Sequence, residues 1–373
     1  MRVVGAVLVA LAALVFLFAS VLKHPVYTPD GSVYARFAAR DAGYSDRDAT
    51  AAEKAFYGGT ALMQNARYRE IVDLAPGVWF ARSRVFVNRI LYPWIVGMAM
   101  GAAGLRALFL VSAGAYVAFG LALYWMLLAF KRPAFAFALS VIALALPQVR
   151  GAAGSDLTDM LAMLWWVLSL GALLRLSRET RPAMLFVLAV SGTLLALTRP
   201  TPYLVVLPAL AIGIVRASWA PLLASLGSVA AYAIVAFATH AFGISEQLRW
   251  IYGNLPNGTK ASFTTWYRSA LLASVRFVAA ETVRTIVPLL AIVAAIYGVS
   301  RSRTRAPMAV LAAAAIACLI AVPFNPVPSS FARVLLLPLI PVFCAMAQCI
   351  AEAALEKRTA MAPVEVTPEA VKA

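Results

Sequence analysis

The sequence predicts an all-α fold, a polytopic transmembrane bundle of about 10–11 helices with two structured extracytoplasmic loops. The first observation is composition, because 63% of the residues are hydrophobic and only 13% are charged. Soluble domains are about half apolar and about a quarter charged. The second observation is the mean hydropathy of +0.84, and the third is the recurrence of apolar runs along the chain. Together they indicate a protein embedded in a lipid bilayer.

The first apolar run covers residues 3–22 and is preceded only by Met1 and Arg2. Its length matches a hydrocarbon core of roughly 30 Å. A cleaved signal peptide is the competing interpretation, but the apolar run is too long and Lys23-His24-Pro25 lacks the small residues of a cleavage site. We therefore expect a retained first helix over residues 1–22.

A polar loop over residues 23–84 follows, and it is too long for a simple connection. Apolar residues at helical spacing predict a short amphipathic helix that begins near Asp30. A second helix is expected to begin with Asp48 as its cap and to end at Gly58-Gly59. Such helices commonly lie flat in the membrane interface.

Further apolar runs predict the remaining helices of a single transmembrane domain over residues 1–358. A helical core is expected over residues 85–240, a second extracytoplasmic loop over residues 241–284, and C-terminal helices over residues 285–358. Residues 359–373 are expected to form a disordered cytoplasmic tail. The runs cover residues 90–105, 107–130, 134–147, 157–174, 184–197, 203–215, 222–239, 286–300, 308–324 and 334–355.

The distribution of Lys and Arg predicts the orientation. Basic clusters at 175–181, 301–305 and 357–358 are expected to be cytoplasmic, as is the N-terminus, in a bacterial inner membrane. An odd number of crossings is then needed between residues 84 and 175, where four apolar runs occur. We expect residues 107–130 to form a re-entrant hairpin that does not cross.

The formal net charge of +16 does not indicate nucleic-acid binding. The arginines occur mainly in short connections between apolar runs, where they orient the chain among membrane lipids, and no basic stripe lies on a soluble domain. The cysteines Cys318, Cys344 and Cys349 lie inside apolar runs without metal-ligand spacing, so we interpret them as small core residues.

All seven aspartates fall in the first loop or at the head of one helix, and the predicted orientation places all of them outside. Asp30 is the first acid after the first helix, where a general base would remain solvated. It can equally be a turn or cap residue, since Pro-Asp-Gly is strong turn chemistry. Asp156 and Asp159 can contact substrate, or can simply favour the positive end of the helix dipole.

Three arginines lie at the outer ends of apolar runs: Arg89, Arg199 and Arg333. Their guanidinium groups would suit a phosphate or diphosphate headgroup, because arginine offers planar bidentate donors. Alternatively they only anchor helix ends by snorkelling. In the second loop, Arg249-Trp250 pairs a cation with an aromatic ring, which can stack on a sugar or belong to an aromatic belt.

Four short motifs together resemble the GT-C superfamily, the membrane glycosyltransferases that take sugars from polyprenyl-phosphate donors. They are Asp30-Gly-x-x-Tyr34 after the first helix, Arg89-Ile-Leu-Tyr92-Pro93, Ser155-Asp156-Leu-Thr-Asp159 and Leu197-Thr-Arg199-Pro200. The resemblance covers roughly residues 1–205 and implies that Asp30 is the catalytic base. With this chemistry we expect Arg89, Arg199 and Arg333 to hold the donor phosphate, Tyr92 to contact the substrate, and Asp156 or Asp159 to orient sugar hydroxyls.

The resemblance implies an inverting transfer to a lipid-linked or envelope glycan acceptor. The chain departs from some members of the superfamily by having Asp30-Gly31 in place of an Asp-Glu pair. A divalent cation is therefore possible but unsupported, and no other cofactor or paired-cysteine metal site is indicated. Two other functions remain open: an undecaprenyl-diphosphate-glycan ligase or polymerase that uses Arg249 and Arg268, and a lipid or glycan transporter.

Overall fold

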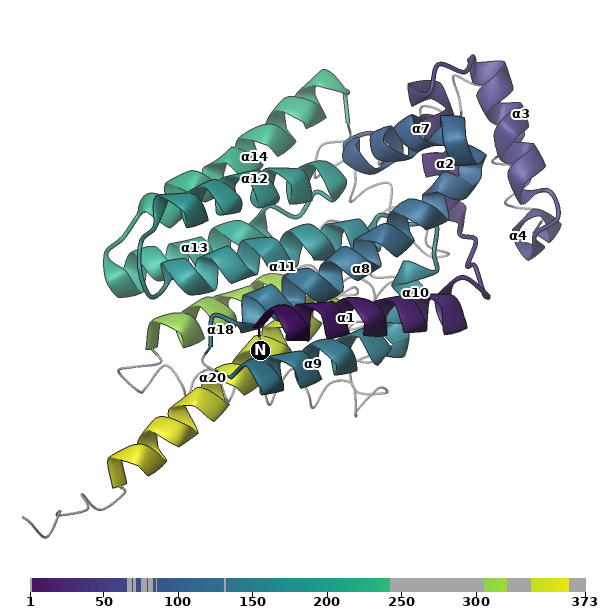
Figure 1. Cartoon of the computed structure of the whole chain (residues 1–373). Coiled ribbons are helices and arrows are strands. Elements are labelled where there is room, and N and C mark those ends of the chain that lie inside the picture. Colours follow the sequence, from purple (N-terminus) through teal and green to yellow (C-terminus); the bar gives the residue numbers. More distant parts are fainter. Residues whose placement is uncertain are drawn as a thin grey trace, which may run out of the picture.

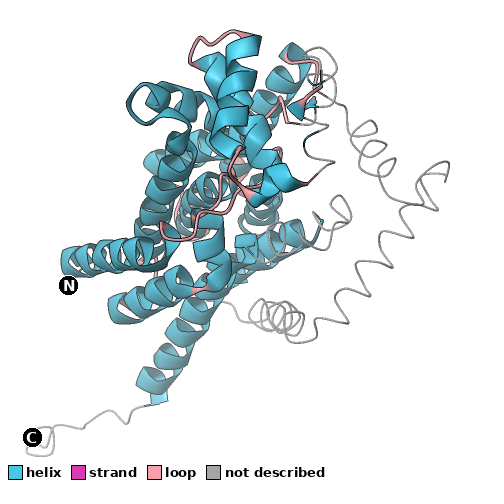
Figure 2. Ribbon diagram, turned by 90° about the vertical axis from the view of Figure 1, so that its right-hand side faces the viewer, coloured by secondary structure: helices cyan, strands magenta, loops and turns pink. Residues whose placement is uncertain are grey.

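The computed structural model describes residues 2–65, 69, 72–74, 79, 83–84, 86–130, 132–241, 305–320 and 337–361. In this part of the chain the regular secondary structure is helical, and short loops connect the helices (Figure 2). The predicted all-α fold is confirmed for these residues. The predicted second loop (241–284), the run 286–300 and the tail lie almost entirely outside them.

The first half of the chain forms α1 (Arg2–Phe16), the π-helical turn η1 (Leu17–Val21), α2 (Pro29–Asp41), α3 (Asp46–Tyr57), α4 (Ala61–Gln64), α7 (Leu91–Ala103), the 3₁₀ turn η2 (Gly104–Arg106) and α8 (Ala107–Leu127). The remainder forms α9 (Pro133–Ala145), α10 (Pro147–Ala153), α11 (Asp159–Leu176), α12 (Pro182–Thr198), α13 (Tyr203–Arg216), α14 (Ala220–Ala238), α18 (Arg305–Ile320) and α20 (Leu337–Met361).

Five helical segments among the described residues are long and apolar enough to cross a membrane, as expected of an integral membrane protein. A sixth arises if α9 and α10, which meet at a bend of 64°, are counted as one span. Shorter apolar helices, α12, α13 and α18, accompany them. The five segments are Arg2–Val21, Leu91–Leu127, Asp159–Leu176, Ala220–Ala238 and Leu337–Ala354.

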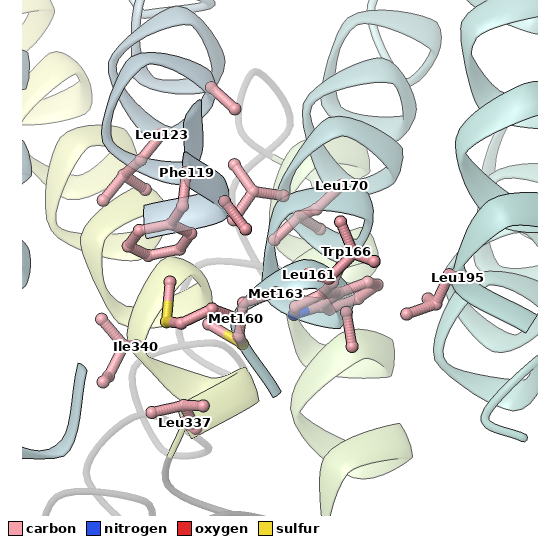
Figure 3. Packing of buried hydrophobic residues seen from close by; sticks show 14 of the residues in the cluster. Phe119, Leu123, Met160, Leu161, Met163, Trp166, Leu170, Leu195, Leu337 and Ile340 are labelled. Atoms are coloured by element: carbon pink, nitrogen blue, oxygen red, sulfur yellow. The ribbon is translucent and has the colours of Figure 1, made fainter. Parts of the chain in front are cut away.

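The bundle is organised around α8 and α11, which pack along each other, with α12 on the far side of α11 (Figure 1). Phe119 and Leu123 of α8 approach Met160 and Met163 of α11 in the buried core, and α20 covers them (Figure 3). The indole Nε1 of Trp166 donates a hydrogen bond of 2.9 Å to the carbonyl oxygen of Pro338. This bond ties α11 to α20 without leaving a buried donor unsatisfied.

The predicted re-entrant hairpin over residues 107–130 is wrong. Residues Ala107–Leu127 form one continuous helix of 21 residues, which spans about 31 Å at 1.5 Å per residue. The chain instead breaks before it, at Gly104, whose φ of 57° lies in the region that favours glycine. The preceding α7 has 13 residues, or about 20 Å, and is too short to cross alone.

Helix α7 packs against α2, and α3 packs on the other side of α2, so these helices gather at one end of the bundle (Figure 1). The contact between α7 and α2 is close at Gly97. A Cβ atom there would lie 2.9 Å from the carbonyl oxygen of Ala38. We call the region formed by α2, α3 and α7 the α2 end of the bundle.

The two amphipathic helices expected in the first loop are present. Helix α2 begins at Pro29, next to Asp30 as predicted, and its cap is Thr28. Helix α3 begins earlier than predicted, because Ser45 and not Asp48 is its cap. The Ser45 hydroxyl accepts a hydrogen bond from the Asp48 amide and donates one of 2.6 Å to the Asp48 carboxylate. Ser45 therefore caps the helix, and the Asp48 side chain holds the capping hydroxyl in place.

A buried ion pair joins α2 to α3. Arg36 Nη2 lies 2.5 Å from Glu53 Oε2, and the two side chains are 3% and 1% exposed. The Arg36 guanidinium also donates to the carbonyl oxygen of Val72 at 3.1 Å and lies 4.2 Å from the ring centroid of Trp79. The described part of the first loop is therefore a packed unit rather than a loose connection.

Candidate functional site

The segment that follows the first helix is paired with the segment that precedes α11. Val26 forms a parallel bridge with Ser155, in which the Val26 amide donates to the carbonyl oxygen of Gly154 at 2.8 Å. The Asp156 amide donates to the carbonyl oxygen of Val26 at 3.4 Å. These bonds fix the path of the chain just before α2 begins.

The carboxylate of Asp156 holds the first turn of α2 in place. Its Oδ1 accepts a 2.7 Å hydrogen bond from the Thr28 hydroxyl, and both of its oxygens lie 3.1 Å from the Thr28 amide nitrogen. Its Oδ2 accepts a 2.7 Å bond from the hydroxyl of Tyr57, at the end of α3. One fully buried carboxylate therefore binds the starts of α2 and α11 and the end of α3 together.

Glycine at position 31 is required by this arrangement. A Cβ atom there would lie 2.0 Å from Cγ of Asp156, far inside van der Waals contact. The Thr28 hydroxyl in turn accepts a hydrogen bond of 2.9 Å from the Gly31 amide, which caps the helix. The Asp-Gly sequence at 30–31 is thus explained by close packing as well as by turn chemistry.

Asp30 lies in the first turn of α2 and is partly exposed. Amide groups at a helix N-terminus carry partial positive charge, and acidic residues are favoured in the first turn for this reason. The next turn of the helix places Tyr34 below it, and Tyr34 is completely buried. Both residues belong to the Asp-Gly-x-x-Tyr pattern.

Tyr34 is the point at which the predicted arginines meet α2. Arg89 Nη1 donates a hydrogen bond of 2.5 Å to the Tyr34 hydroxyl oxygen, and its guanidinium lies 5.0 Å from the ring centroid of Phe86. Burial raises the pKa of the Tyr34 hydroxyl. The nearby positive charges of Arg89 and Arg199 act against this rise, and the negative charge of Asp30 adds to it. Asp30, Arg89 and Arg199 therefore all lie within electrostatic range of one hydroxyl.

Arg199 is held by an acid from the neighbouring helix. Its Nη1 lies 2.8 Å from Asp159 Oδ1. The Asp159 side chain is fully buried and that of Arg199 is 14% exposed. Since a buried charge is stable only with a partner of opposite sign, the pair fixes Arg199 at the junction between α12 and α13.

Tyr92 packs against Tyr34 in the buried core. Its ring meets that of Tyr34 edge-on, with centroids 5.6 Å apart, and its hydroxyl donates to the carbonyl oxygen of Leu108 at 2.9 Å. The hydroxyl therefore joins α7 to α8. We expected this residue to bind the donor, but in this conformation it is buried.

Burial raises the pKa of Asp156 from its ordinary value of 3.8 to about 6. The hydrogen bonds from Tyr57 and Thr28 act in the opposite direction, since they stabilise the charged form. Loss of water is the larger effect. Asp156 thus remains ionised at neutral pH but titrates within the range of mildly acidic surroundings.

Of the predicted site residues, the structure gathers Asp30, Arg89, Tyr92, Asp159 and Arg199 at the α2 end of the bundle. Asp156 also lies at the α2 end, where it is buried and accepts hydrogen bonds from the cap of α2. The remaining predicted residues, Arg249, Trp250 and Arg333, lie outside the described residues.

Sequence reasoning missed Tyr34, Thr28 and Tyr57 as parts of the site. The sequence contained a signal for Tyr34, because its spacing of four residues from Asp30 places both on one face of a helix. Thr28 also had one, since Thr before Pro-Asp-Gly is a common helix cap. The contact between Tyr57 and Asp156 joins residues 99 positions apart and had none.

No group of three or more His, Cys, Asp or Glu side chains is arranged to hold a metal ion within the described part of the chain. Comparison with protein-family models gives no match. Curated proteins and solved structures give none either.

Proposed function

We propose that the protein is an inverting membrane glycosyltransferase of the GT-C type. It would transfer a sugar from a polyprenyl-phosphate donor to a lipid-linked or envelope glycan acceptor, on the extracytoplasmic face of a bacterial inner membrane. The proposal rests on the sequence resemblance and on one arrangement in the structure, namely that Arg89 donates a hydrogen bond to the Tyr34 hydroxyl and that Asp30 and Arg199 lie within electrostatic range of the same hydroxyl.

This arrangement joins the two groups that the reaction needs. A partly exposed carboxylate can accept a proton from an acceptor hydroxyl. Two guanidinium groups nearby can bind the donor phosphate and stabilise the charge that develops as it leaves. The apolar segment formed by α1 and η1 ends at Val21, nine residues before Asp30, so a donor could keep its tail in lipid.

In the proposed reaction, the acceptor oxygen forms a bond to the anomeric carbon as Asp30 takes the hydroxyl proton. The bond between that carbon and the phosphate oxygen breaks, and its electron pair leaves with polyprenyl phosphate. Attack from the face opposite the leaving group inverts the anomeric centre. Arg89, oriented by Tyr34, and Arg199, oriented by Asp159, would contact the departing phosphate.

Substitution of Asp30 tests the assignment. Asp30→Asn keeps the size of the side chain but removes the base, so we expect transfer to be abolished while thermal stability stays the same. Asp41→Asn is the matched control, because Asp41 is an exposed acid at the other end of the same helix. The readout is mass spectrometry of envelope lipids and glycans in a deletion strain that carries each variant.

Wild-type product from the Asp30→Asn strain would overturn the assignment of the base. A separate Arg249→Ala strain tests the alternative ligase or polymerase, in which Arg249 and not Asp30 is essential. Lipids and glycans that change location without any covalent difference would instead indicate a transporter.

A further inference from the structure

A second basic position lies outside the group of proposed catalytic residues. Arg150 belongs to α10, the short helix that follows the 64° bend after α9. Helix α10 packs against η1, the π-helical turn at the end of α1. Helical turns of this kind occur frequently at functional sites.

Few described groups are placed to neutralise the positive charge of Arg150. Its Nη1 makes a single long contact of 3.4 Å, to the hydroxyl oxygen of Ser20 in η1, whose own proton is donated to the carbonyl oxygen of Phe16 at 2.9 Å. Its Nε is buried and has no hydrogen-bond partner among the residues that the structure describes. No carboxylate in that part of the chain forms an ion pair with it.

The surroundings of Arg150 are those of a lipid-facing seam. Apolar side chains are exposed here, since Phe18 of η1 is 63% exposed and Leu22, which follows η1, is 40% exposed. A partly buried guanidinium beside such a surface is unfavourable unless an anion approaches it.

We propose that Arg150 and Ser20 form a binding site for the phosphate group of a membrane lipid, in the seam between η1 and α10. The phosphate oxygens would accept from the Arg150 guanidinium, including the buried Nε, and the acyl or prenyl chains would lie along the exposed face of α1. The phosphate can come from an anionic phospholipid or from a polyprenyl phosphate. The site does not depend on the proposed transferase activity.

The location also connects this site with the α2 end of the bundle. Helix α10 ends at Ala153, and Gly154, Ser155 and Asp156 follow immediately with their bonds to Val26 and Thr28. A Cβ atom on Gly154 would lie 3.3 Å from the carbonyl oxygen of Val21, so η1 and the α10 end are in close contact. Lipid bound in the seam would brace the segment that positions Asp30.

Lipid binding to the purified full-length protein tests the site by native mass spectrometry in detergent. The probes are phosphatidylglycerol, undecaprenyl phosphate and diacylglycerol, which has the tails without the phosphate. We expect Arg150→Gln to weaken binding of a phosphate-bearing lipid about 10- to 100-fold, and Arg150→Lys to weaken it less. Arg106→Gln, which alters an exposed arginine in η2, is the matched control and should leave binding unchanged.

The lipid whose binding falls in Arg150→Gln identifies the source of the phosphate. Loss for phosphatidylglycerol alone assigns the site to bulk lipid, and loss for undecaprenyl phosphate alone assigns it to a polyprenyl carrier. Equal binding by Arg150→Gln and Arg106→Gln would overturn the proposal, as would equal binding of diacylglycerol by the wild type. Because Arg150→Lys retains the charge, it reports on the site even where Arg150→Gln fails to fold.

Discussion

Asp156 accepts hydrogen bonds from both the amide and the hydroxyl of Thr28, a residue 128 positions earlier in the chain. Thr28 is the cap of α2, so the carboxylate acts on the helix through its cap. The proposed base, Asp30, is the second residue of the same helix. Its position therefore depends on an acid that is itself fully buried.

Asp156→Asn should loosen the start of α2. The substitution replaces one acceptor oxygen with an NH₂ group, which cannot accept the hydrogen bonds that Thr28 or Tyr57 donates at that position. We expect a loss of about 1–3 kcal/mol in the free energy of unfolding and faster hydrogen exchange at the amides of α2. Asp48→Asn, at the exposed start of α3, is the control. Unchanged exchange in α2 would show that the clamp does not hold the helix.

The titration of Asp156 should appear in the pH dependence of stability. Its pKa is higher in the folded protein, about 6 against an ordinary 3.8, so the folded state binds an extra proton between these values. The free energy of unfolding should therefore fall as the pH rises from about 4 to about 6, by on the order of 3 kcal/mol. Thermal melts of the wild type and of Asp156→Asn measure this, and the slope should disappear in the variant.

Gly31→Ala should disrupt the contact between α2 and Asp156. The added methyl group would lie 2.0 Å from Cγ of Asp156, and either the carboxylate or the helix must move. We expect destabilisation of about 1–3 kcal/mol and increased protease sensitivity of the first loop. Gly59→Ala is the matched control, since a Cβ atom at Gly59 meets nothing within 4 Å. Equal melting temperatures for the two variants would contradict the observed packing.

Tyr34→Phe should disturb the position of Arg89 while leaving the fold unchanged. The ring that packs on Tyr92 and Phe86 is retained, but the acceptor for Arg89 Nη1 is lost. If Arg89 binds the donor phosphate, transfer should fall about 10-fold with little change in melting temperature. Tyr44→Phe, in the exposed turn between α2 and α3, should have no effect. A transfer rate equal to that of the wild type would remove Tyr34 from the site.

The buried pair Arg36–Glu53 and the exposed pair Lys54–Asp73 allow a comparison within the same loop. Arg36→Met should destabilise the protein by about 3–5 kcal/mol, because Glu53 is left buried without its partner. Arg36→Met with Glu53→Leu should recover much of this loss. Lys54→Met should change the stability by less than about 1 kcal/mol. A double variant that melts no higher than Arg36→Met would refute a buried-charge penalty.

Local patterns in the sequence predicted the helices well. The apolar spacing after Asp30 located α2, since a helical face is a property of neighbouring residues. The cap of α3 was misplaced because Ser45 and Asp48 are both of residue types that cap helices, and the two side chains bond to each other. Sequence alone does not say which one is the cap.

Two features of the structure could not be predicted from the sequence. The break before α8 depends on the positive φ of Gly104, and glycine adopts many conformations, so the sequence allowed the break to be placed in the wrong helix. The bonds among Thr28, Tyr57 and Asp156 depend on how distant helices pack. The sequence placed acids and arginines near helix ends, but only packing brings Arg89 and Arg199 near the same hydroxyl.

The distance along the chain between Thr28 and Asp156 sets an order of assembly. During synthesis Thr28 leaves the ribosome first, and its acceptor follows only after 128 more residues. Those residues include α8 and α9, which are therefore synthesised before Asp156. Until then the first turn of α2 lacks its buried carboxylate. The helix that carries the proposed base therefore acquires this support only after the chain has been made as far as Asp156.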